Sequence, residues 1–214
     1  MFKQKIALGL LAACASLAHA SGMDSLEQFV KTAKTGRAEF TQVVTAPAKE
    51  GQAARSKTSS GTFEFSRPNR FRFVYKKPFE QTIVADGQTL WLYDVDLNQV
   101  TSRKQSSVLA SSPAALIASA SDIKALQADF NLSNGGDAAD KDGLEWVLAA
   151  PKAKEGMLQS VRVGFKGSEL SVLEIVDSFG QRSVMRFSAL RVNTPLEASV
   201  FQFKPPVGAD LIQQ

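Results

Sequence analysis

Cysteine and histidine are nearly absent from this chain of 214 residues, which holds one of each. Cys14 and His19 both lie within the first 20 residues, which have the layout of a removable signal. Without that signal the chain has neither a thiol nor an imidazole. This absence excludes an intramolecular disulfide, a Cys/His zinc site, a cysteine nucleophile and a Ser-His-Asp triad.

Residues 1–20 are predicted to form a secretory signal peptide. Two lysines precede a short apolar segment at residues 6–13, and Ala18-His19-Ala20 fits a small-x-small cleavage site. The apolar segment is too short to span a bilayer as a helix. Cleavage at this site would make Ser21 the first residue of an exported mature chain.

A second interpretation of the same segment stays open. Leu11-Ala12-Ala13-Cys14 also fits a lipobox, in which Cys14 would be lipidated and would become the first residue. The apolar segment before such a lipobox would be unusually short. The two interpretations differ in whether the mature chain carries a lipid anchor.

An excess of charge of either sign is also missing. Removal of Lys3 and Lys5 with the signal leaves 23 of the 25 Lys and Arg residues, against 21 Asp and Glu residues. A net charge near +2, with both signs interspersed, gives no support for nucleic-acid binding. Residues 21–214 suffice for one domain with a sizeable core, and no internal repeat or domain linker is evident.

The stretch from residue 67 to residue 94 carries the clearest structural pattern. Aromatic and mainly cationic side chains alternate over residues 70–75, which predicts a strand with one aromatic face. Asp86-Gly87 between two apolar runs predicts a β-hairpin. Any even-numbered loop there gives two shared faces, Ile83 with Leu90 and Leu92, and Val84 with Trp91 and Tyr93. Because both faces are apolar, this hairpin is covered on both sides or lines a cavity.

Further patterns predict a mainly β (α+β) fold with about ten or eleven antiparallel strands. A helix is expected over residues 24–34 with Asp24 or Ser25 as its cap, and residues 47–60 are predicted to form a polar loop. The other predicted strands are residues 37–44, 62–65, 98–103, 130–132, 144–149, 158–165, 170–178, 182–191 and 200–203. Pro205-Pro206 is expected to end the sheet, and residues 122–128 to form a helical turn.

Residues 106–120 interrupt the strand pattern with a segment rich in Ala and Ser. Two short helices are predicted, at residues 107–110 and 113–120, with Pro113 in the first turn of the second. Such small side chains pack closely but weakly, which suits a lid that moves. An ordinary crossover helix explains the same composition without any function, and the composition alone favours it.

Several motifs together resemble the LolA family of periplasmic lipoprotein carriers. They are Phe40-Thr41-Gln42, Arg67-Pro68-Asn69 followed by Phe71, the run from Val84 to Tyr93, and Phe201-Gln202-Phe203-Lys204-Pro205-Pro206. Each motif is modest alone, but their order and spacing through most of the mature chain are fairly specific. The resemblance implies an incomplete antiparallel β-barrel with an N-terminal helix and short lid helices covering its concave face.

The resemblance also implies a function without covalent chemistry. A monomeric periplasmic chaperone of this family, with no cofactor or metal, accepts acylated lipoproteins from an inner-membrane ABC exporter complex. It then delivers them to an outer-membrane receptor. A lipid-anchored Cys14 would instead fit an outer-membrane receptor of the same fold. An enzyme would have to use carboxylates such as Asp86, Asp94 or Asp96, or a Ser-Lys pair, and no constellation of such groups is evident.

Two sets of site residues follow from the family pattern. Arg67, the Arg of the Arg-Pro-Asn motif, is expected to hold the lid shut by hydrogen bonds to lid backbone. The expected acyl-chain contacts are Phe71, Phe73, Ile83, Leu90, Leu92, Leu116 and Ile117. From the residues alone, Arg67 could be a surface residue at a strand start, and the apolar set could be an ordinary closed core.

Overall fold

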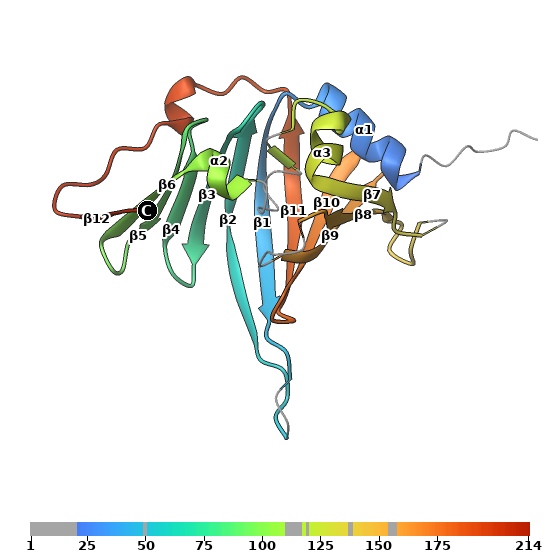
Figure 1. Cartoon of the computed structure of the whole chain (residues 1–214), viewed down its shortest axis with the longest axis horizontal. Helices are drawn as coiled ribbons and strands as arrows, with labels where there is room; N and C mark the ends of the chain where they lie inside the picture. Colours follow the sequence, from blue (N-terminus) through green and yellow to red (C-terminus); the bar gives the residue numbers. More distant parts are fainter. Residues whose placement is uncertain (1–20, 49–50, 110–116, 119, 137–138, 154–157) are drawn as a thin grey trace, which may run out of the picture.

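A single open β-sheet of 12 strands organises the chain (Figure 1). The computed structural model describes residues 21–48, 51–109, 117–118, 120–136, 139–153 and 158–214. The strand order is β12-β6-β5-β4-β3-β2-β1-β11-β10-β9-β8-β7, so that β12 and β7 form the two edges. Every neighbouring pair is antiparallel except β12 and β6, which are parallel.

The described elements follow one another in a simple order. The helices are α1 (Gly22–Thr32), α2 (Gln105–Leu109), α3 (Ile123–Asp129) and the 3-10 helix η2 (Ala198–Phe201). The strands are β1 (Thr35–Thr45), β2 (Ser56–Ser66), β3 (Arg70–Lys77), β4 (Gln81–Ala85), β5 (Thr89–Asp94), β6 (Gln99–Lys104), β7 (Phe130–Asn134), β8 (Glu145–Pro151), β9 (Leu158–Lys166), β10 (Glu169–Asp177), β11 (Arg182–Val192) and β12 (Asp210–Gln213). The prediction of an incomplete, mainly β barrel is confirmed.

Helix α1 begins two residues before its predicted start. Ser21 is the N-cap, and its hydroxyl accepts from the backbone N–H of Asp24, whose carboxylate accepts from Ser21 in return. This capping box satisfies free N–H groups at the helix start. The predicted caps were therefore wrong. Asp24 occupies the third helical position, and the buried Ser25 donates to Glu145 of β8.

The predicted hairpin of β4 and β5 has the expected side-chain faces. Ile83 lies opposite Leu92, and Val84 lies opposite Trp91. The turn, however, is centred one residue later than Asp86-Gly87, because the backbone N–H of Asp86 still donates to Thr89. The side-chain faces are unchanged, since both turns contain an even number of residues.

The polar loop predicted at residues 47–60 is shorter than expected. Strand β2 begins at Ser56, and it pairs with β1 along its whole length, from Thr35 opposite Ser66 to Thr45 opposite Ser56. The end of this hairpin projects beyond the other strands (Figure 1). Both of its faces are largely exposed, so its sequence lacks the apolar alternation that marks a half-buried strand.

The C-terminal prediction was also wrong. Residues 198–201 form η2 rather than a strand, and Phe203 packs its ring against Trp91 at 5.6 Å between centroids. Trp91 lies on the sheet face opposite to Leu90 and Leu92. Phe203 is therefore partly buried by packing against that face, without pairing its backbone to a strand. The last strand, β12, follows the expected end of the sheet at Pro205-Pro206. Its four residues are all exposed, so no apolar pattern marks it.

The region between β6 and β7 agrees with prediction where it is described. Helix α2 covers Gln105–Leu109, two residues ahead of the predicted start, and α3 covers Ile123–Asp129 with Asp122 as its cap. Most of the helix predicted at residues 113–120 lies outside the described residues. Within it, Ile117, Ala118 and Ala120 are described, and all three are buried.

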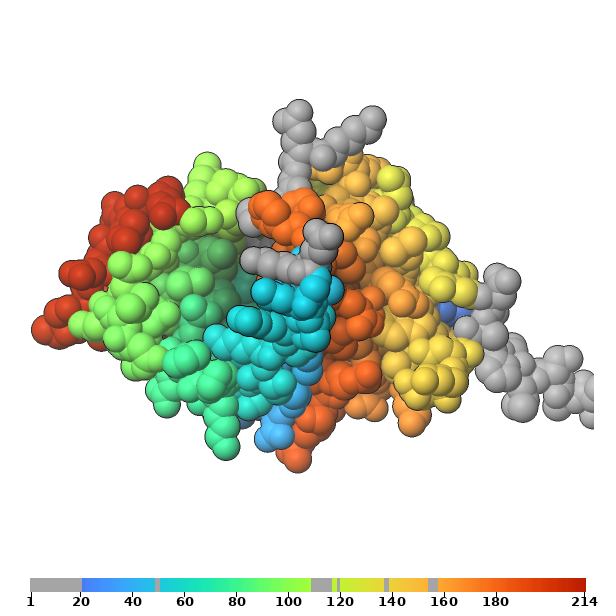
Figure 2. All heavy atoms as spheres, turned by 90° about the horizontal axis from the view of Figure 1, so that it is seen from below, coloured from blue at the N-terminus to red at the C-terminus, as the bar shows by residue number. Residues whose placement is uncertain are grey.

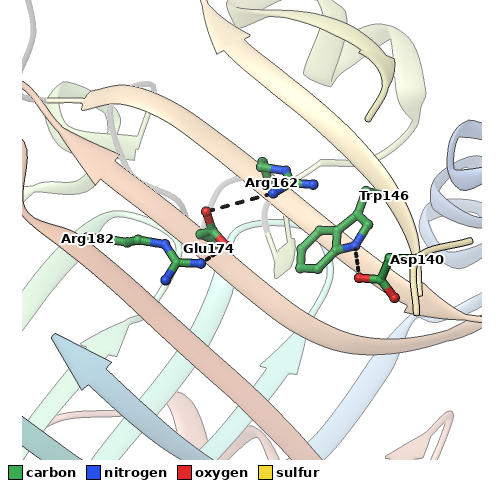
Figure 3. Close-up of polar contacts among 5 residues, drawn as sticks. All are labelled: Asp140, Trp146, Arg162, Glu174 and Arg182. Atoms are coloured by element: carbon green, nitrogen blue, oxygen red, sulfur yellow. Dashed lines mark hydrogen bonds and ion pairs between the residues drawn. The ribbon is translucent and has the colours of Figure 1, made fainter. Parts of the chain in front are cut away.

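The chain's two tryptophans are each held by an aspartate in a preceding turn. Trp91 Nε1 donates to Asp86 at 3.0 Å, and Trp146 Nε1 donates to Asp140 at 2.7 Å (Figure 3). The second oxygen of each carboxylate accepts backbone N–H groups of the turn. The Arg162 guanidinium lies 4.4 Å from the Trp146 ring centroid, and Arg162 and Arg182 flank Glu174.

From these contacts we expect the free energy of unfolding to fall in acid. Burial raises the pKa of Asp86, but hydrogen bonds from Thr89, Gln88 and Trp91 outweigh burial and hold the pKa below its ordinary value. The Trp146 hydrogen bond lowers the pKa of Asp140. A carboxyl whose folded pKa is depressed stabilises the fold above its unfolded pKa, and that contribution is lost as pH falls through the folded pKa.

The expected result concerns urea unfolding between about pH 5 and about pH 2. The double variant Asp86→Asn, Asp140→Asn should lose less unfolding free energy over this range than the wild-type chain. Asp142→Asn is the matched control, because Asp142 bonds to Asp140 through its backbone N–H and not through its carboxylate. An equal acid loss in the double variant and the wild type would contradict the prediction.

Candidate functional site

Four phenylalanines form an aromatic row on the concave face of the sheet. The register of β2 and β3 places Phe63 opposite Phe73, and Phe65 opposite Phe71. The Phe63 and Phe73 rings stack at 4.4 Å between centroids, and all four side chains are buried. The aromatic face predicted from alternation is therefore a continuous cross-strand row.

The apolar candidates of β4 and β5 continue this row. Ile83 lies opposite Phe73 and also opposite Leu92, while Leu90 lies opposite Ala85, the partner of Phe71. Ile83, Leu90 and Leu92 are half-buried. Ile117 is buried in the same hydrophobic cluster. The structure thus brings six of the seven predicted acyl-chain contacts together, and Leu116 lies outside the described residues.

Helices cover the upper end of this concave face (Figure 1). Leu26, Phe29 and Val30 of α1 and Leu126 of α3 belong to the same cluster as the phenylalanines. Phe29 lies 6.0 Å from Phe65 and 5.9 Å from Phe165, which joins α1 to both halves of the sheet. Ala118 and Ala120 are also buried in this cluster.

Arg67 lies at the centre of the covered end rather than on the surface. Its side chain is buried, its Nε donates to Ala33 O at 2.8 Å, and its Nη1 donates to Ala120 O at 3.0 Å. Ala33 is the C-cap of α1, where free carbonyls and the helix dipole favour a cation. Arg67 therefore connects the end of β2, the end of α1 and the segment before α3.

The Arg67 guanidinium is incompletely compensated. The rings of Phe29 and Phe65 lie 5.2 Å and 5.3 Å away, and Nη2 has no hydrogen-bond partner within the described residues. Burial lowers the pKa of Arg67 to about 10, so the side chain stays charged at neutral pH. Because desolvation opposes the two hydrogen bonds, the contact is weaker than its bond count suggests.

Gln105, which the sequence analysis did not identify, holds the start of the same segment. Its side chain is 1% exposed; Nε2 donates to Asn69 O at 2.6 Å, and Oε1 accepts from Gly87 N at 2.9 Å. Its backbone N–H donates to Gln88 O. This amide therefore ties α2 to the β2–β3 and β4–β5 turns, and both polar atoms of the side chain have a partner.

The lower end of the concave face is open and more polar. A cavity of about 630 Å³ lies there, and Figure 2, which views the molecule from this end, shows the surface recessed between strands β3–β6 and the β1–β2 hairpin. The cavity is lined by Gln42, Val44, Ala46, Arg55, Ser56, Lys57, Ser59, Tyr75, Pro78, Phe79, Gln81, Asp94, Asp96, Leu97 and Gln181. The concave face thus changes from aromatic to polar along its length.

Two of the three carboxylates considered for an enzyme serve turns in this structure. Asp86 accepts from Trp91, and Asp94 accepts from the backbone N–H of Leu97. Over the described residues, no group of His, Cys, Asp and Glu is placed to hold a metal ion. None of the helices in the described part of the chain is long and apolar enough to cross a membrane.

Comparison with known proteins identifies the family. The family model "Outer membrane lipoprotein carrier protein LolA" matches residues 31–204. This chain belongs to the LolA family. An outer-membrane lipoprotein carrier protein of Albidiferax ferrireducens is 70% identical over 208 residues, which cover 95% of this chain and 96% of that protein. Another from Methylibium petroleiphilum is 50% identical over 214 residues and covers both chains completely.

A distant solved structure shares the fold of this LolA-family chain. An uncharacterized conserved protein from Thermus thermophilus has a TM-score of 0.50 and 11% sequence identity, over 90% of this chain and 96% of that one. At this identity the likeness concerns the fold alone. The resemblance inferred from the motifs is confirmed, while the roles of the individual site residues stay predictions.

Proposed function

We propose that this chain is a periplasmic carrier that binds the acyl chains of lipoproteins released from the inner membrane and delivers them to an outer-membrane receptor. The observation that carries this proposal is the apolar concave face, closed at one end by helices, with the buried Arg67 bonded there to the carbonyls of Ala33 and Ala120. The curated names of relatives at 70% and 50% identity support a carrier rather than an anchored receptor.

The chemistry of the concave face suits a hydrocarbon ligand. Aromatic and aliphatic side chains line it, and burying one methylene of an acyl chain is worth about 0.8 kcal/mol. A chain of about 16 carbons therefore supplies enough free energy to displace part of an apolar contact surface. Transfer then needs no covalent step, only different affinities of exporter, carrier and receptor for the same acyl chains.

The segment from Gln105 to Ala120 would act as the lid in this mechanism. Arg67 would hold its end through the carbonyl of Ala120, and Gln105 would fix its start to two turns of the sheet. Opening would expose Phe71, Phe73 and their neighbours to the acyl chains. The carrier would work as a monomer made of residues 21–214, with an ABC exporter complex and an outer-membrane receptor as its partners.

The direct test compares one lipoprotein with and without its acyl chains. The mature chain should co-elute with the acylated form in gel filtration, and it should not co-elute with a form whose acylated cysteine is replaced by alanine. The apolar concave face has nothing to bind in the second form. Equal binding of both forms, or of neither, would refute the proposed function.

A further inference from the structure

A set of polar side chains crosses the lower end of the concave face. We call Gln42, Ser59, Tyr75, Gln81 and Asp94 the polar collar. The register places Gln42 opposite Ser59, and it places Gln81 opposite both Tyr75 and Asp94. Tyr75, Gln81 and Asp94 follow the aromatic row by one pleat, at the level where β2 has Gly61 opposite Tyr75. Gln42 and Ser59 lie one pleat further on, and all five collar residues line the cavity.

Three members of the collar have free hydrogen-bonding capacity. Among the described residues, the side chains of Ser59, Tyr75 and Gln81 make no hydrogen bond, although all three are half-buried. Burial raises the pKa of Tyr75 to about 12, so its hydroxyl stays protonated and able to donate. Their polar atoms are not buried from water, since Arg67 Nη2 is the only such buried, unpartnered side-chain atom among the described residues. A purely apolar ligand would displace that water and leave them unpaired, whereas a ligand with hydrogen-bonding groups would pair with them.

We propose that the polar collar binds the ester and amide groups that join the acyl chains of a lipoprotein to its peptide. This inference rests on the proposed function, because it assumes that acyl chains occupy the concave face. The collar would thus bind the polar linkage of the ligand, which lies between its hydrocarbon chains and its folded protein.

The concave face changes from apolar to polar along its length, as the ligand does from its acyl chain to its ester. Phe73 and Tyr75 are two residues apart on one face of β3, a separation of roughly 7 Å. Within that distance the lining changes from a buried phenylalanine to a phenol beside an unpaired amide. An acyl chain against the aromatic row would therefore place its ester at Tyr75 and Gln81, where donors are available.

Contacts of Gln42, Asp94 and the Tyr75 ring hold the strands that carry the collar in place. Gln42 Nε2 donates to Ser183 Oγ at 2.7 Å, and Asp94 Oδ1 accepts from Leu97 N at 3.0 Å. The Tyr75 ring packs against Phe40 at 5.0 Å between centroids. The free donors are thus mounted on fixed strands, which lowers the entropy lost on binding.

The test separates the head of the ligand from its hydrocarbon. The mature chain and the double variant Tyr75→Phe, Gln81→Leu are titrated with a tripalmitoylated cysteinyl lipopeptide and with diphenylhexatriene, a hydrocarbon probe without hydrogen-bonding groups. Loss of two hydrogen bonds should raise the lipopeptide Kd roughly tenfold and leave the probe Kd within about twofold. Thr82→Val, on the opposite face of β4, is the control and should change neither Kd.

Each other outcome decides against the inference. An unchanged lipopeptide Kd would mean that the collar holds only water. Equal weakening of both ligands would mean that the substitutions disturb the wall rather than a specific contact. If the wild-type chain bound the probe but not the lipopeptide, the proposed function itself would fail, and this inference would fail with it.

Discussion

Replacement of Arg67 with Leu is expected to slow release of bound lipoprotein to the receptor by about tenfold or more. The variant loses the hydrogen bonds to Ala33 and Ala120, which in the proposed mechanism would favour the closed state without cargo. A carrier that closes less readily keeps its acyl chains longer, because closure competes with the ligand for the same apolar face. Leu preserves the apolar contacts with Phe29 and Phe65, so the fold should persist.

The measurement is the rate at which preloaded carrier passes lipoprotein to receptor-containing membranes. Arg70→Leu is the matched control, since Arg70 lies in the next strand with its guanidinium 5.8 Å from the Phe201 ring. That substitution should leave the rate unchanged. The role of Arg67 as a latch would be refuted if the Arg67 variant released its cargo as fast as the wild-type chain.

Replacement of Gly36 with Ala is expected to lower the free energy of unfolding by about 3 kcal/mol. In most strands alanine is the better residue, because glycine loses more backbone entropy on folding. Here the new methyl group would overlap the Phe65 ring, which is fully buried. Phe65 also contacts Phe63 and the Arg67 guanidinium, so it has little room to move.

Urea unfolding of a double-mutant cycle checks this steric explanation. Phe65→Leu should cost less free energy in the Gly36→Ala background than in the wild type, because the smaller side chain relieves the overlap. Strictly additive losses would show that the methyl group does not meet the ring. A stabilising effect of Gly36→Ala alone would contradict the packing at this position.

The sequence predicts those parts of the fold in which burial is periodic. Alternation located β3, and the Asp86-Gly87 turn signal between two apolar runs located β4 and β5. An even-numbered loop then assigned Ile83 and Leu92 to one face, because side chains in a strand alternate with a period of two. It failed for the end of the β1–β2 hairpin and for β12. Those segments pair through their backbones while their side chains remain exposed, so nothing in their composition reports the pairing.

The site was predictable only in part for a related reason. The aromatic row follows from alternation in β3, but the role expected for Arg67 came from resemblance to a family. Gln105 gave no signal at all. Its partners are backbone atoms of Asn69 and Gly87, in two turns that are distant from it in the sequence. Contacts between a side chain and remote backbone depend on the assembled fold, so local pattern does not encode them.

Gln105 and Arg67 differ in charge and in hydrogen-bond pairing, and this difference bears on the order in which their contacts would break. The Gln105 amide is neutral and fully paired, whereas the Arg67 guanidinium is charged and keeps an unpaired nitrogen among the described residues. When the Gln105 contacts break, no charged group gains hydration. When the Arg67 contacts break, a buried cation regains its hydration, which offsets part of the cost. In the proposed mechanism, Ile117, Ala118 and Ala120 would therefore move away from the sheet before Gln105 does.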